Sequence, residues 1–159
     1  MIKKLTVVAG LVTAVAVGSM ALAGGHSSSP EEKAIKARKA QMQLYSFHLG
    51  ILGAMAKGEM DYNADLASAA ATSLAAVANS NQMAMWPPGT DSDTMAGKTR
   101  ALPAIWQDGS KAVEISMQLA AASSTMAESA GNGVDGIRSA IGAVGKACGA
   151  CHDDYRQPR

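Results

Sequence analysis

The feature that most constrains this chain is a five-residue motif close to its end, Cys148-Gly149-Ala150-Cys151-His152. The C-x-x-C-H pattern is typical of covalent c-type haem attachment, in which each thiol forms a thioether bond with one vinyl group of the porphyrin. Positions three residues apart are neighbours on one helix face, so both sulfurs can reach the same porphyrin edge. The imidazole of His152 would then bind the iron as its proximal ligand. We therefore predict one covalently bound haem c, with its iron, attached through Cys148 and Cys151.

Two other kinds of site also use closely spaced cysteines, and neither matches the rest of this sequence. A structural zinc site would need two further ligands, but the remaining histidines, His26 and His48, show no matching spacing. A thioredoxin-like redox dithiol belongs to a βαβ unit, and the sequence has no strand signal of any strength. The chain has 2 cysteines, and the haem motif uses both of them. Haem attachment is therefore the favoured interpretation.

The N-terminal residues have the pattern of a secretory signal peptide. A basic start precedes an apolar run over residues 5–17, and a small-x-small cleavage pattern ends at Ala23. The apolar run is too short for a comfortable membrane span, although an uncleaved membrane anchor is the alternative. We predict that residues 1–23 are removed, which leaves a haem domain over residues 24–159. Because bacteria attach c-type haem outside the cytoplasmic membrane, export fits the haem motif and predicts a periplasmic protein.

The charge balance of the mature chain argues against a polyanionic partner. The full chain has 14 basic and 13 acidic residues, and loss of Lys3 and Lys4 leaves 12 basic residues against 13 acidic ones. Neither nucleic acid nor an anionic membrane surface is therefore expected as a partner. Aromatic residues make up only 4% of the chain, so its helices have few large side chains to fill a core. A haem would supply the missing apolar volume.

Hydrophobic periodicity predicts two helices in the first half of the mature chain. The first runs over about residues 31–57, after Ser29 as its N-cap and before Gly58 as its C′ residue. Its apolar stripe consists of Met42, Tyr45, Leu49, Leu52 and Ala56. The second helix is rich in alanine, begins at a cap at position 61 or 63, and ends near position 79. Because the link between them is short, the two helices should be antiparallel neighbours.

The second half of the chain predicts a long loop followed by two more helices. Residues 79–103 contain Trp-Pro-Pro-Gly and a polar run, which indicate a crossing loop with a short helical turn near 95–100. The third helix is predicted over about 103–124, with Gly109 as a weak point inside it, and the fourth over about 134–156. Their candidate core residues are Ile105, Trp106, Val113, Ile115, Met117, Leu119, Ile137, Ile141, Val144, Ala147, Cys151 and Tyr155. We predict an all-α fold, an antiparallel four-helix bundle with haem c on its C-terminal helix.

Four segments, in this order, resemble those of the cytochrome c′ family, most of all its low-spin branch, called cytochrome c-556 or c-554. They are Arg38 and Met42 with residues 52–59, Trp86-Pro87-Pro88-Gly89-Thr90, Leu102-Pro103-Ala104-Ile105-Trp106, and residues 145–156 with the haem motif. The resemblance covers about residues 36–156. The last segment is the most specific, because ordinary small cytochromes c carry their haem motif near the N-terminus.

The resemblance implies cofactor-binding roles for two arginines. Arg38 matches the position that pairs with a haem propionate, and a guanidinium suits a carboxylate through two hydrogen bonds. The alternative is one more exposed charge among neighbouring lysines. Arg156 matches an arginine close to the proximal imidazole, where its charge can alter the basicity of His152 and the haem potential. The alternative is a basic residue that complements a helix C-terminus.

Met42 occupies the position that the resemblance assigns to the distal side of the iron. In most cytochromes c′ a hydrophobic residue stands there without binding the iron, which stays five-coordinate and high-spin. In the low-spin branch a methionine there is the sixth ligand, which raises the reduction potential and closes the iron to outside ligands. A methionine on a core stripe can also serve packing alone.

We predict a periplasmic monohaem one-electron carrier, low-spin, with His152 and Met42 as axial ligands and no substrate turnover. Its partners would be periplasmic or membrane-bound redox proteins, and the resemblance implies that a homodimer through the first two helices can form. The alternative is a five-coordinate, high-spin cytochrome c′ that binds NO or CO. A peroxidase is disfavoured, because no distal acid-base histidine lies on the Met42 stripe and His48 lies off it.

Overall fold

The computed structural model describes residues 28–158, and every regular element in this range is a helix. The long helices are α1 (Pro30–Lys57), α2 (Ala64–Ala78), α3 (Ala112–Ser129) and α4 (Val134–Tyr155). Two short 3₁₀ helices, η1 (Met83–Met85) and η2 (Pro103–Trp106), lie in the connection between α2 and α3. The predicted all-α four-helix fold is confirmed, whereas the predicted signal peptide, residues 1–23, lies outside the described residues.

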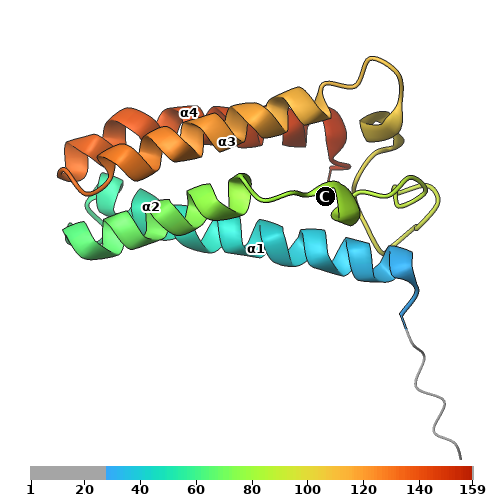
Figure 1. Ribbon diagram of the computed structural model, residues 1–159, viewed down its shortest axis with the longest axis horizontal. Coiled ribbons are helices and arrows are strands. Elements are labelled where there is room, and N and C mark those ends of the chain that lie inside the picture. Colours follow the sequence, from blue (N-terminus) through green and yellow to red (C-terminus); the bar gives the residue numbers. More distant parts are fainter. Residues whose placement is uncertain (1–27, 159) are drawn as a thin grey trace, which may run out of the picture.

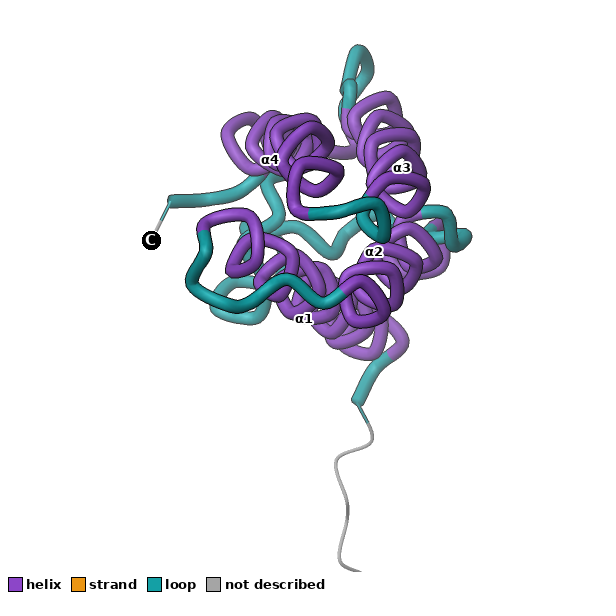
Figure 2. Tube along the Cα trace, turned by 90° about the vertical axis from the view of Figure 1, so that its left-hand side faces the viewer, coloured by secondary structure: helices purple, strands orange, loops and turns teal. Residues whose placement is uncertain are grey.

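The four long helices form an antiparallel bundle (Figures 1 and 2). Each helix packs against the next one around the bundle, and α4 closes the ring against α1. The short α1–α2 and α3–α4 turns lie at one end, and the long α2–α3 connection lies at the other, beside the last turn of α4 (Figure 1). We call these the turn end and the cavity end. No helix within residues 28–158 combines the length and the apolar character needed to cross a membrane.

Helix α1 begins and ends where local sequence signals place its limits. The Ser29 hydroxyl accepts a hydrogen bond from the Glu32 backbone N–H (3.2 Å), and the Glu32 carboxylate accepts one from the Ser29 N–H (3.2 Å). Such a capping box satisfies two backbone donors that the first helical turn leaves free. At the other end, Gly58 adopts φ 76°, a left-handed conformation that glycine takes without strain.

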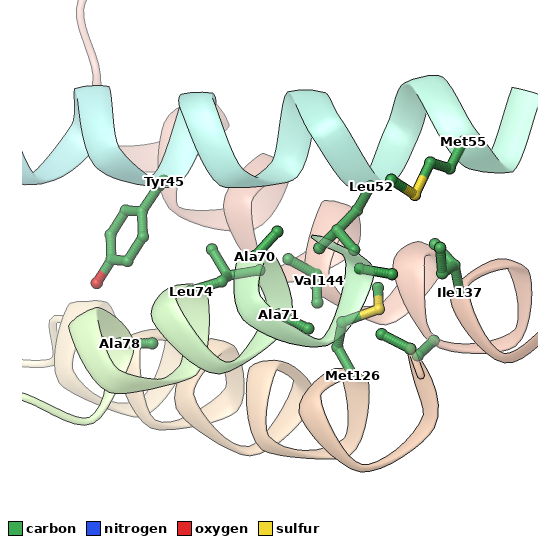
Figure 3. Packing of buried hydrophobic residues seen from close by; sticks show 13 residues of the cluster. Tyr45, Leu52, Met55, Ala70, Ala71, Leu74, Ala78, Met126, Ile137 and Val144 are labelled. Atoms are coloured by element: carbon green, nitrogen blue, oxygen red, sulfur yellow. The ribbon is translucent and has the colours of Figure 1, made fainter. Parts of the chain in front are cut away.

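The apolar core fills the bundle from its middle towards the turn end (Figure 3). Its largest fully buried apolar side chains are Leu52, Met55, Leu74, Met126, Ile137 and Val144. Helix α2 contributes Ala67, Ala70 and Ala71, whose small side chains let the neighbouring helices approach closely. The core thus draws on all four helices, as their apolar stripes predict.

The third helix differs from its prediction in both limits. It begins at Ala112 instead of about 103 and ends at Ser129 instead of about 124. Gly109 was predicted as a weak point inside the helix, but it has φ 83°. A residue in this left-handed conformation cannot continue a right-handed helix, so η2 and α3 are separate helices. Val113 and Met117, predicted as core residues, are 75% and 68% exposed. They stand at the cavity end, where both side chains border the cavity.

The α2–α3 connection is tied to the end of α4 by backbone hydrogen bonds. The Leu102 N–H donates to the Tyr155 carbonyl (2.9 Å), and the Gln157 N–H donates to the Arg100 carbonyl (2.8 Å). The Tyr155 hydroxyl accepts a further bond from the Lys111 N–H (2.7 Å). These bonds fix the crossing loop relative to the helix that carries the haem motif.

Candidate haem site

Helix α4 directs the three residues of the haem motif towards one cavity at the cavity end. Cys148, Cys151 and His152 all border this cavity, whose volume is about 600 Å³. Ligand pockets in proteins are commonly about 300–1,000 Å³, so the space suits a cofactor. Met42, the predicted distal residue, borders the same cavity from α1.

The other walls of the cavity are mostly apolar and unusually exposed. Met83, Val113 and Met117 border it and are 82%, 75% and 68% exposed, respectively. Trp86 and Trp106 add two large aromatic rings from the crossing loop and η2. An apolar prosthetic group held there would cover surface that a water-filled cavity would leave wet. The residues present therefore fit a haem c.

Thioether formation requires free thiols, and neither Cys148 nor Cys151 is in a disulfide bond. Burial raises the pKa of each thiol, so both are protonated before they react. Within residues 28–158 no cluster of three or more histidine, cysteine or acidic side chains could hold a metal ion by itself. The rival reading of Cys148 and Cys151 as half of a zinc site thus gains no further ligands from the described part of the chain.

The pKa of the His152 imidazole is lowered, which favours the neutral form that a metal ligand needs. Burial is the largest cause that lowers its pKa, followed by the positive charge of Arg156, with Asp153 opposing and Arg100 adding to the decrease. Arg156 follows the last residue of α4 and forms an isolated β-bridge with Ala101. Its positive charge contributes to the lowered pKa of His152, and its role beside a haem-bound imidazole stays a prediction.

Arg38 lies in an environment that the sequence analysis did not foresee. Arg38 is 3% exposed, and its side chain reaches into the crossing loop, where Nη1 donates to the Thr90 hydroxyl (2.7 Å) and Nη2 donates to the Thr99 hydroxyl (2.7 Å). Nη2 also donates to the Thr90 carbonyl. The guanidinium stacks against Trp86, with 4.8 Å from Cζ to the ring centroid. The alternative of an exposed charge is wrong, and Arg38 supports the cavity wall from behind.

Two features of the site escaped the sequence analysis. The sequence predicts Tyr45 only as part of the apolar stripe of α1, yet it borders the cavity and its hydroxyl has polar partners on α1 and α2. The threonine partners of Arg38 are 52 and 61 residues away in sequence, and no spacing rule connects them. One signal in the sequence could have indicated buried partners for Arg38. The arginine lies one turn before Met42 on an apolar stripe, and a charged side chain is buried only when polar groups pair with it.

Comparison of the sequence with known proteins relates this chain to haem proteins of one family. A profile of the family described as cytochrome C′ matches residues 33–156. The chain is 38% identical over 149 residues to the cytochrome c′ of Allochromatium vinosum, which covers 93% of each protein. It is 34% identical over 126 residues to a cytochrome c-554 of Cereibacter sphaeroides, which covers 79% of this chain and 94% of that one.

Solved structures agree with this relationship. Cytochrome c′ from Thermochromatium tepidum superposes with a TM-score of 0.73 at 36% identity, over 82% of this chain and 98% of that one. A cytochrome c′ described as having a ligand-controlled dimer dissociation gives 0.74 at 34% identity, over 83% and 99%. A nitric oxide complex of a cytochrome c′ variant from Alcaligenes xylosoxidans gives 0.70 at 28% identity, over 83% and 100%. With its haem motif on the last helix of such a bundle, the chain belongs to the cytochrome c′ family and carries one covalent haem c.

Proposed function

We propose that this protein is a periplasmic monohaem cytochrome whose iron keeps an exchangeable sixth position and binds small ligands such as NO or CO. The observation that carries the proposal is the family match, in which a solved relative is described as a nitric oxide complex. Met42 borders the cavity and is not part of the buried core. The stronger match to cytochrome c′ (38% identity) than to cytochrome c-554 (34% identity) supports the same choice.

The chain's residues divide the work at this site. Cys148 and Cys151 would hold the porphyrin covalently, and His152 would bind the iron from the proximal side. The haem, when bound, supplies an iron that accepts one electron or one ligand. Arg156 would adjust the donor strength of His152 through its charge, and Arg38 would keep the crossing loop closed over the cavity, with its predicted propionate contact as an additional role.

The second candidate is the low-spin electron carrier, which the position of Met42 favours. Met42 borders the same cavity as His152, so its thioether is the side chain that would supply a sixth ligand. An iron with imidazole and thioether ligands exchanges electrons without taking up outside ligands. Periplasmic or membrane-bound redox proteins would then be its partners.

Optical spectroscopy of the intact protein separates the two candidates. We expect a high-spin spectrum in the oxidised protein, rapid CO binding in the reduced protein, and no change of spin state in Met42→Ala. Met117→Ala, a methionine change elsewhere in the cavity wall, is the matched control. A low-spin spectrum with the far-red methionine-to-iron band, lost in Met42→Ala and kept in Met117→Ala, would establish the carrier instead.

We also propose that two copies associate through α1 and α2. Leu44 and Phe47 on α1 are 46% and 63% exposed, and Leu66 on α2 is 41% exposed, which leaves apolar surface for a partner helix pair. A solved relative described as having a ligand-controlled dimer dissociation supports this assembly. Sedimentation should give a dimer whose dissociation constant rises in Phe47→Glu. A concentration-independent monomer would contradict it.

A further inference from the structure

Tyr45 is the polar residue of α1 that reaches the cavity. It lies one helical turn after Met42, is 6% exposed, and borders the same cavity. Figure 3 shows its ring at the end of the buried cluster away from Ile137, with the hydroxyl at its tip. A buried phenol hydroxyl normally has a definite hydrogen-bond partner, so its contacts indicate what it is free to do.

Both acceptor positions of the Tyr45 hydroxyl are filled by amide groups. Gln41 Nε2 donates to it at 3.1 Å, and Gln82 Nε2 donates at 3.2 Å. Gln82 Nε2 also donates to the Ala78 carbonyl (3.2 Å), and Gln41 Nε2 lies 3.5 Å from the Val77 carbonyl oxygen, so a nitrogen rather than an oxygen of each amide faces the phenol. A hydroxyl has two lone pairs and one proton. The Tyr45 hydroxyl can therefore only act as a donor to any further group.

The proton of this hydroxyl is weakly used within the protein. Its acceptor is the Val77 carbonyl at 3.4 Å, whereas O–H···O bonds are usually about 2.7–2.8 Å long. That carbonyl already accepts a 2.7 Å bond from the Ser80 hydroxyl. Burial raises the pKa of Tyr45, so the phenol keeps its proton at neutral pH. The hydroxyl can turn towards a better acceptor in the cavity without leaving Val77 unsatisfied.

We propose that Tyr45 is a ligand-binding residue that donates a hydrogen bond to a small ligand held at the iron. Gln41 and Gln82 act as positioning residues that fix the direction of its phenol. The ligand class is a diatomic or small anionic molecule with an acceptor atom away from the iron. This inference rests on the proposed function, because it needs a ligand in the sixth position.

The test compares Tyr45→Phe with the unchanged protein, using CO as the probe. Loss of a hydrogen bond to the CO oxygen should move the C–O stretching band of the reduced complex to higher wavenumber. It should also speed CO dissociation by about two- to tenfold, the factor for one ordinary hydrogen bond. Tyr62→Phe is the matched control, since its hydroxyl donates to the Ala130 carbonyl (3.0 Å) and accepts from the Gly133 N–H (2.8 Å) at the turn end. It should leave the band and the rate unchanged.

The inference would be overturned if Tyr45→Phe lowered the unfolding temperature but left the C–O band and the CO dissociation rate unchanged. Tyr45 would then have a structural role only. If the unchanged protein takes up no CO, the proposed function fails first. The same comparison then uses Met42→Ala with and without Tyr45→Phe, where removal of the thioether opens the sixth position. Identical bands in that pair, or no CO complex in either, would overturn the role of Tyr45.

Discussion

The two ends of the bundle are stabilised by different means. Towards the turn end, Leu52, Met126, Ile137 and Val144 are fully buried against one another. At the cavity end, large apolar side chains such as Met83 and Met117 are 82% and 68% exposed. The same alanine-rich, aromatic-poor chain therefore builds one close-packed half and one half whose apolar surface faces a cavity.

Polar links take the place of apolar packing at the cavity end. The buried Arg38 guanidinium binds Thr90 and Thr99, and the Trp106 indole N–H donates to the Trp86 carbonyl (3.0 Å). These hydrogen bonds join residues that lie 20 to 61 positions apart in the sequence. The comparison indicates that the turn end folds on its own side chains, whereas the cavity end is shaped in advance for a haem that completes its packing.

The largest expected effect is the loss of covalently bound haem from the cavity end. Replacing both Cys148 and Cys151 with serine should abolish covalent haem completely, because no thiol remains to form a thioether. Acid acetone should then extract the haem, and mass spectrometry should give the mass of the polypeptide alone. Covalent haem retained in the double variant would refute the assignment of the motif.

The second prediction contrasts a core side chain with a cavity side chain. Leu52→Ala should lower the free energy of unfolding by about 2–5 kcal/mol, because it opens a hole among side chains that cannot collapse into it. Met117→Ala, whose side chain borders the cavity and is not enclosed by the buried core, should lower it by less, about 1 kcal/mol. Urea unfolding of the haem protein measures both. Similar losses would contradict the contrast between the two ends.

The third prediction concerns the link through Arg38. Arg38→Gln should destabilise the protein by about 2–3 kcal/mol, since it leaves buried acceptors of the crossing loop without a donor. Limited proteolysis should then cut faster within residues 86–100. The neighbouring exposed Lys39→Gln should change neither quantity. If Arg38→Gln shifted only the haem reduction potential, Arg38 would act on a propionate and not on the loop.

The smallest expected effect is a pH dependence of that loop. Backbone hydrogen bonding from Thr94 is the largest cause that lowers the pKa of Asp91 below its ordinary value. Because the folded pKa is the lower one, the stabilisation is present above the unfolded pKa and is lost as pH falls through the folded pKa. Asp91→Asn should therefore reduce the acid sensitivity of the unfolding midpoint, and the exposed Asp108→Asn should not. Equal acid sensitivity in both variants would contradict it.

Much of the fold was predictable because its signals are local. The limits of α1 follow from Ser29 and Gly58, and the start of α4 follows from a glycine-rich break, each within a few residues of the feature it controls. The beginning of α3 was predicted wrongly for a related reason. A glycine within a helical pattern is compatible with either a weak helix or a break, and only the surrounding structure selects φ 83° at Gly109.

The sequence predicted the part of the site that adjacent residues form, which is the haem motif. It did not predict the part that the crossing loop contributes. The haem motif needs only its own five positions, whereas the partners of Arg38 come from segments more than 50 residues away. Likewise, an apolar stripe does not distinguish Leu52, which is fully buried, from Met42, which borders the cavity. Hydrophobic periodicity predicts which face of a helix is apolar, but not whether that face packs against other helices or borders a cavity.

By itself, the sequence determined that this is a helical chain with a covalent haem on its last helix, because helix formation and thioether chemistry both act over one or two turns. Only the tertiary structure decided which residues surround the cavity. It buried Arg38 behind the tryptophans, left Met42 partly exposed, and turned the Tyr45 hydroxyl into a donor with little to bind. These outcomes depend on how four helices and a long loop pack together, and side chains far apart in sequence meet only through that packing.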